Sequence, residues 1–187
     1  LPLSVNLSAL QFEQTGLVET VINALSTHQI PAELLTLEVT ETTAMTNPDE
    51  SIRILTQLTD LGVKASIDDF GTGYSSLLYL KRLPASELKI DRAFVKELQE
   101  QTEDATIVSA IVALAQTLNL KVVAEGVETP EQQHFLTSLG CNTLQGYLLG
   151  RPLAADKVPE LADFFTGEKA AEGAESTPVQ PKAADAG

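Results

Sequence analysis

Short apolar runs rich in β-branched residues alternate with longer helical patterns along most of this chain. In the helical stretches, apolar residues recur three or four positions apart, the spacing of one face of an α-helix. Strands that alternate with helices fold into a parallel sheet covered by helices, so the pattern predicts an α/β architecture. The positions with helical spacing are Leu17, Val18, Val21, Ile22 and Leu25; Ile52, Leu55, Leu58 and Leu61; and Ile107, Ile111, Leu114 and Leu118.

Two of these helices carry start signals. Residues 47–50 (Asn-Pro-Asp-Glu) place an N-cap residue before a first-turn proline and a capping-box acid, and residues 129–132 (Thr-Pro-Glu-Gln) repeat the arrangement. Gly62 and Gly140 fall where helix C-caps belong. These signals predict where the helices begin and end.

Each apolar run leads into a polar residue of a type that binds metal ions or phosphate. In parallel α/β folds the carboxyl ends of the strands meet on one side, and in barrels the chemistry lies there. We therefore expect these side chains to surround a single site. They are Asn6, Glu38, Asp68, Asp69, Lys89, Glu125 and Gln145.

Residues 66–76, Ser-Ile-Asp-Asp-Phe-Gly-Thr-Gly-Tyr-Ser-Ser, are the most informative of these segments. The adjacent carboxylates of Asp68 and Asp69 repel each other unless a cation lies between them or one is protonated. Hard cations such as Mg²⁺ take oxygen ligands, so the pair indicates a divalent metal site. The alternative is a polar turn that enters a helix, with Asp69 as its cap. The glycine pattern is not a dinucleotide-binding fingerprint, because Ser76 stands where the third glycine would be.

An ordered set of segments resembles the successive motifs of the EAL domain, the family of cyclic di-GMP phosphodiesterases. The resemblance covers about residues 1–165. Its segments are Ser4-Val5-Asn6-Leu7-Ser8, Leu37-Glu38-Val39-Thr40-Glu41, Asp68 to Leu77, Leu88-Lys89-Ile90-Asp91-Arg92, Val122 to Thr129, Gln145-Gly146-Tyr147-Leu148 and Gly150-Arg151-Pro152-Leu153.

One departure from the family pattern matters. The Glu-Ala-Leu that gives the family its name, with a metal-binding glutamate, is absent, and the chain starts at the asparagine strand. The resemblance therefore implies an incomplete TIM-type (β/α) barrel with about six mostly parallel strands where the family has eight. We expect a partial domain over residues 1–166. Residues 167–187, rich in Ala, Glu and Pro, are predicted to be a disordered tail.

The resemblance implies metal-dependent hydrolysis of cyclic di-GMP to linear pGpG in bacterial signalling, with two Mg²⁺ or Mn²⁺ ions as cofactors. In the implied ligand set, Asn6, Glu38 and Asp68 hold the first ion with the absent glutamate. Asp68 bridges to the second ion, which Asp69 and Glu125 complete. With one ligand absent, we expect little or no turnover from this chain alone.

Further roles follow from the same resemblance. Lys89 would contact the attacking water and the phosphate, although a salt bridge to Asp91 or Glu87 is the structural alternative. Glu125 is also a candidate general base. Glu41 would anchor the glycine-rich loop through Thr72 or through backbone N–H groups. Gln145 and Asp91 are candidates for substrate binding, although Gln145 could equally be a core polar residue.

The resemblance also implies partners. The loop after Asp69 is a possible homodimer contact, and a sensor or diguanylate-cyclase-like domain is expected upstream in the full protein. Two other functions remain open. One is a non-catalytic module that binds cyclic di-GMP, and the other is an unrelated barrel enzyme that abstracts a proton with Lys89.

Composition limits the remaining possibilities. The net charge of −14 argues against a nucleic-acid polymer as partner, because such grooves need clustered Lys and Arg. Cys141 is the single cysteine and is expected to be a packed thiol, which fits a cytoplasmic protein. The full protein could still be anchored to a membrane through upstream segments. His28 and His134 lie in helical stretches and are expected to be surface or packing residues.

Overall fold

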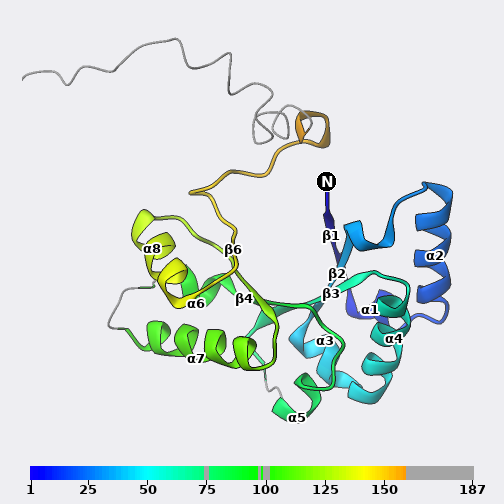
Figure 1. Cartoon of the computed structure of the whole chain (residues 1–187), viewed down its shortest axis with the longest axis horizontal. Helices are drawn as coiled ribbons and strands as arrows, with labels where there is room; N and C mark the ends of the chain where they lie inside the picture. Colours follow the sequence, from blue (N-terminus) through cyan, green and yellow to red (C-terminus); the bar gives the residue numbers. More distant parts are fainter. Residues whose placement is uncertain (74–75, 97, 99–101, 159–187) are drawn as a thin grey trace, which may run out of the picture. The chain divides into compact units, whose positions relative to one another are not determined.

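A computed structural model describes residues 1–73, 76–96, 98 and 102–158 of the chain. Within this part, six strands form one sheet in the order β1-β2-β3-β4-β5-β6, and all five pairings are parallel. Helices surround the curved sheet, which makes the molecule an incomplete TIM-type α/β barrel (Figure 1). The predicted fold class is confirmed.

The elements follow the order expected from the sequence. The strands are β1 (Leu3–Leu7), β2 (Leu35–Thr40), β3 (Lys64–Phe70), β4 (Glu87–Ile90), β5 (Lys121–Ala124) and β6 (Thr143–Leu144). The α-helices are α1 (Ala9–Phe12), α2 (Leu17–Thr27), α3 (Glu41–Thr46), α4 (Pro48–Asp60), α5 (Leu77–Leu80), α6 (Arg92–Lys96), α7 (Glu103–Thr117) and α8 (Pro130–Leu139). Two short 3₁₀ turns span Ala32–Leu34 and Ala155–Lys157.

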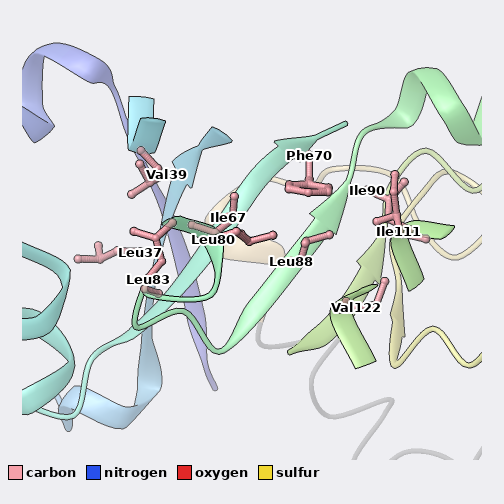
Figure 2. Packing of buried hydrophobic residues seen from close by; sticks show 14 of the residues in the cluster. Leu37, Val39, Ile67, Phe70, Leu80, Leu83, Leu88, Ile90, Ile111 and Val122 are labelled. Atoms are coloured by element: carbon pink, nitrogen blue, oxygen red, sulfur yellow. The ribbon is translucent and has the colours of Figure 1, made fainter. Parts of the chain in front are cut away.

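Side chains alternate between the two faces of the central strands. Residues that face the helices are apolar and fully buried, and Figure 2 shows them side by side across the sheet. The intervening residues of the same strands, Glu38, Asp68 and Lys89, face the opposite way because successive side chains of a strand point to opposite faces. The core residues on the helical side include Leu37, Val39, Ile67, Leu88, Ile90 and Val122.

The helix signals are confirmed with one difference. Thr129 caps α8 and forms a full capping box with Gln132, and Gly140 ends this helix in a left-handed conformation. Asn47 caps α4, but Glu50 bonds to Arg53 instead of returning to the cap. An arginine one turn away therefore competes successfully for the capping-box acid.

The chain divides into two units, and residues 1–150 form the first of them. The predicted tail, residues 167–187, lies outside the described residues. Within the described part of the chain, no helix is both long and apolar enough to cross a membrane.

Candidate functional site

The side chain of Lys89 lies at the centre of a buried cluster of carboxylates. Its Nζ is 2.9 Å from Glu38 Oε2, 3.2 Å from Asp68 Oδ1 and 2.7 Å from Glu125 Oε1. Strands β2, β3 and β4 supply three of these residues, and Glu125 directly follows β5. The strand ends therefore converge as expected, and the partners of Lys89 are not the alternatives Asp91 and Glu87.

Asn6 reaches the same cluster from β1. The register pairs it with Glu38, and its terminal amide lies 3.1 Å from Glu38 Oε2 and 3.3 Å from Asp68 Oδ2. With its nitrogen toward these oxygens, the amide donates to both. With its oxygen toward them, three oxygens meet, an arrangement that only a cation makes favourable. The residues present therefore fit an oxygen-ligated divalent cation.

A bulge in β3 turns both aspartates toward the cluster. The pairing of β3 with β4 shifts between Ile67 and Phe70, and Asp69 adopts a left-handed backbone with φ 53°. In a regular strand, adjacent side chains would point to opposite faces. The bulge re-aims the second one, because an extra residue in one strand disrupts the alternation locally. The Asp-Asp pair is therefore part of the strand end and not a helix cap.

Asp69 forms a close pair with a second acid, Asp91. Burial, a hydrogen bond with Asp91 and the negative charges of Asp68, Asp91 and Glu125 together raise the pKa of Asp69 to about 6. Asp91 also accepts a hydrogen bond from the Ala93 backbone N–H at 2.6 Å. The structure thus adds Asp91 to the acidic side of the site, and without a cation a proton eases the repulsion there.

Lys89 supplies the positive charge that holds the other side of the cluster together. Burial alone would lower the pKa of Lys89, but hydrogen bonds to Glu125 and Glu38 and the charge of Asp68 outweigh it and raise that pKa. Among the residues that the structure describes, no three His, Cys, Asp or Glu side chains are already gathered in a metal-binding group. The carboxylates instead gather around an ammonium ion.

Glu41 lies at the start of α3, directly after β2, and is only 1% exposed. Its Oε2 accepts a hydrogen bond from the Gly71 backbone N–H at 2.8 Å, a contact of the kind expected between Glu41 and this loop. A Cβ at Gly73 would approach Glu41 Oε1 to 2.9 Å, so the loop packs closely on the acid. Glu41 therefore connects the end of β2 to the loop after β3.

Gln145 is not brought into the cluster by any contact of its side chain in the described structure. It follows β6 and is exposed, and its backbone bonds to Ala124 O and Val127 N. The sequence interpretation also missed Gly126 and Gly146, which pack against Arg92 and Val127. Both glycines directly follow a polar residue at a strand end, and this repeat is a signal for close backbone approach.

Comparison with known proteins agrees with this arrangement. The model of the EAL domain matches residues 1–152. The chain is 66% identical over 156 residues to the bifunctional diguanylate cyclase/cyclic di-GMP phosphodiesterase MucR of Pseudomonas aeruginosa, which covers 83% of this chain and 23% of MucR. The chain thus spans about a quarter of that relative's length.

Solved structures show the same fold. The PaMucR phosphodiesterase in complex with c-di-GMP superposes with a TM-score of 0.82 at 66% identity, covering 84% of this chain and 70% of that one. The manganese/cy-diGMP complex of Klebsiella pneumoniae BlrP1 at pH 9.0 has a TM-score of 0.73 at 34% identity, covering 81% of this chain and 39% of that one. BlrP1 thus forms a complex with both manganese and the cyclic dinucleotide. The family match and these similarities show that the chain belongs to the EAL domain family.

Proposed function

We propose that this chain is the carboxyl-terminal part of a phosphodiesterase domain that hydrolyses cyclic di-GMP to linear pGpG with divalent cations. The observation that carries the proposal is the convergence of one amide, four carboxylates and Lys89 at the ends of five strands. A phosphodiester needs oxygen-ligated cations and a positive side chain to offset its charge. The substrate class, a cyclic dinucleotide, is taken from two relatives: MucR is a cyclic di-GMP phosphodiesterase, and BlrP1 forms a complex with cy-diGMP.

The proposed ligands fall into two groups that share Asp68. Asn6, Glu38 and Asp68 would hold one Mg²⁺ or Mn²⁺ ion, and Asp68, Asp69 and Glu125 the other. Bound cations of this kind polarise phosphoryl oxygens and lower the pKa of water. The alternation of the strands and the β3 bulge direct these oxygen atoms to one place, so the protein's contribution is their fixed arrangement.

Lys89 would stabilise the charge of the phosphate and orient the attacking water. Its burial and its raised pKa support this role, because such an ammonium stays charged and is surrounded by the residues proposed to bind metal. We assign Glu125, 2.7 Å from Lys89, as a ligand rather than a general base, because a carboxylate bound to a cation has a lowered affinity for a proton.

Three residues would act around this centre. Glu41 would organise the loop after β3 through its bond to Gly71. Asp91, paired with Asp69, and Gln145, exposed at the end of β6, would contact the nucleotide.

The same loop would contribute to a homodimer. The exposure of Leu77 (60%) and Leu78 (67%), in the helix that follows it, supports such a contact. Because MucR is a longer and bifunctional protein, we further propose that a sensor or cyclase-like domain lies upstream in the whole protein. We also propose that the site works in the cytoplasm.

The test needs a longer phosphodiesterase domain, and that of MucR extends beyond the matched segment. We would replace the matched segment of the MucR phosphodiesterase domain by the 156 aligned residues of this chain and measure the conversion of cyclic di-GMP to pGpG with Mn²⁺ by chromatography. The hybrid should hydrolyse the substrate, whereas Asp68→Ala should lose at least about 100-fold in rate. Asp60→Ala, at an exposed position of α4, is the matched control and should keep full activity.

The outcomes separate the candidate functions. An unchanged rate in the Asp68→Ala hybrid would show that the assigned metal chemistry is wrong. A folded hybrid that binds cyclic di-GMP without converting it would favour the non-catalytic binding module. The isolated 187-residue chain should show little or no turnover in the same assay, because it lacks the glutamate that the family pattern places upstream of Asn6.

A further inference from the structure

Gln132 is a buried amide that joins two parts of the structure. It lies in the first turn of α8 and is 5% exposed. Its Nε2 donates to the carbonyls of Val95 at 2.8 Å and Lys96 at 3.1 Å, at the end of α6. Its Oε1 accepts from the backbone N–H groups of Glu128 at 2.8 Å and Thr129 at 3.0 Å. The acceptor half is a helix cap, whereas the donor half reaches a different helix.

The two parts that Gln132 joins each carry a site residue. Helix α6 begins two residues after β4, the strand of Lys89, and the loop that ends at Thr129 begins with Glu125. Lys89 and Glu125 make the shortest ion pair of the cluster, at 2.7 Å. Figure 1 shows α6 and α8 side by side next to β4 and β6. A shift of one part against the other would change this ion pair directly.

Helix α6 packs closely against two loops of the site, the loop after β5 and the loop after β3. A Cβ at Gly126 would lie 2.6 Å from Arg92 Cβ, so the loop after β5 lies directly on the first residue of α6. On the other side, a Cβ at Gly71 would lie 2.8 Å from the ring of Phe94, so the loop after β3 packs on the same helix. Helix α6 is therefore fixed between these loops along its length, and Gln132 holds its end.

We propose that Gln132 is a positioning residue that sets Glu125 against Lys89 by locking α6 to the loop of residues 125–129. Capping α8 requires only the acceptor half of its side chain. The donor half bonds two carbonyls at the end of a five-residue helix. The importance of this contact for activity rests on the proposed function, whereas the contact itself rests only on the hydrogen bonds of Gln132 to the end of α6.

Two variants separate the halves of the side chain. Gln132→Glu keeps an oxygen for the cap and places a second oxygen against the carbonyls of Val95 and Lys96, which removes the lock and leaves the cap. Gln132→Met removes both. Gln133→Met makes the same change at the exposed neighbouring position and serves as control.

The readout is the ammonium signal of Lys89 in the metal-free 187-residue chain, labelled with ¹⁵N-lysine and observed by NMR at pH 7.5. Lys89→Arg identifies the signal, because it removes the labelled lysine and keeps a positive charge among the three acids. A buried ammonium with three carboxylate partners should exchange its protons slowly. Both Gln132 variants should shift this signal and speed its exchange about tenfold, because the hydrogen bond to Glu125 is weakened. Gln133→Met should leave it unchanged.

A purely structural role predicts something different. If both Gln132 variants unfold at lower urea while the Lys89 signal of the folded protein stays in place, the positioning role is wrong. Variants that fail to fold would also overturn it, because the contact would then support the whole sheet. Since neither cation nor nucleotide is present, the outcome does not depend on whether the chain belongs to an active phosphodiesterase.

Discussion

Replacing Lys89 by Met should strongly destabilise the metal-free protein. The change removes the only positive group among Glu38, Asp68 and Glu125 in the described structure, and the side chains of the lysine and these acids are 6%, 9%, 12% and 20% exposed. Removing one partner of a buried ion pair costs about 3–5 kcal/mol, because the remaining charges stay buried without compensation. For a chain of this size, that loss lowers the melting temperature by about 6–20 °C.

Urea unfolding at pH 7.5 in the presence of a chelator measures this effect. Lys121→Met is the matched control, because Lys121 begins the neighbouring strand β5 and is exposed there, so its loss should change the free energy of unfolding by less than about 0.5 kcal/mol. Addition of Mn²⁺ should stabilise Lys89→Met more than the wild type, since the cation replaces the missing charge. If Lys89→Met and Lys121→Met unfold at the same urea concentration, the view of Lys89 as the internal counter-ion is refuted.

Three further predictions follow from single positions. The pKa of Asp69 is raised from 3.8 to about 6, so its folded form favours the proton, and the stability that is present below pH 3.8 is lost as pH rises through 6; without metal, Asp69→Asn should unfold at higher urea than the wild type at pH 7.5, and the difference should shrink steadily as the pH is lowered toward 4. Gly146→Ala should cost at least about 3 kcal/mol, because a Cβ there overlaps the Val127 backbone, whereas Gly150→Ala meets no atom and should be neutral in the same titration. Burial raises the pKa of Cys141 to about 11, so iodoacetamide should alkylate it about 100-fold more slowly at pH 8 than in the urea-unfolded chain; equal rates would contradict its burial.

Much of the fold could be predicted from the sequence because the signals are local. Strands with β-branched residues, helices with regular spacing and caps at Asn47 and Thr129 each depend on a few neighbouring residues. The convergence of Asn6, Glu38 and Asp68 then follows from the geometry of parallel strands, which places equivalent ends on one side. The described structure brings these three side chains together, whereas their roles as ligands stay a prediction.

The rest depended on three-dimensional detail. The left-handed conformation of Asp69 arises from a bulge between two strands, and no local pattern predicts it. The partners of Lys89 lie 51, 21 and 36 positions away in sequence, and the sequence suggested nearer alternatives such as Asp91. Gln132 was visible only as a cap, because its contact with α6 spans 37 residues.

Strands β1 and β6 each have a single neighbour in the described sheet, so the backbone groups on their outer sides are open to hydrogen bonding. On β1, the side chains of Leu3 (61%) and Val5 (39%) are exposed as well. An unpaired strand with apolar side chains is a template for further strands. A polypeptide added in trans that pairs with both edge strands would close the ring, and the yield of such reconstitution would rise with its concentration, because it competes with self-association of the half-barrel for the same edges.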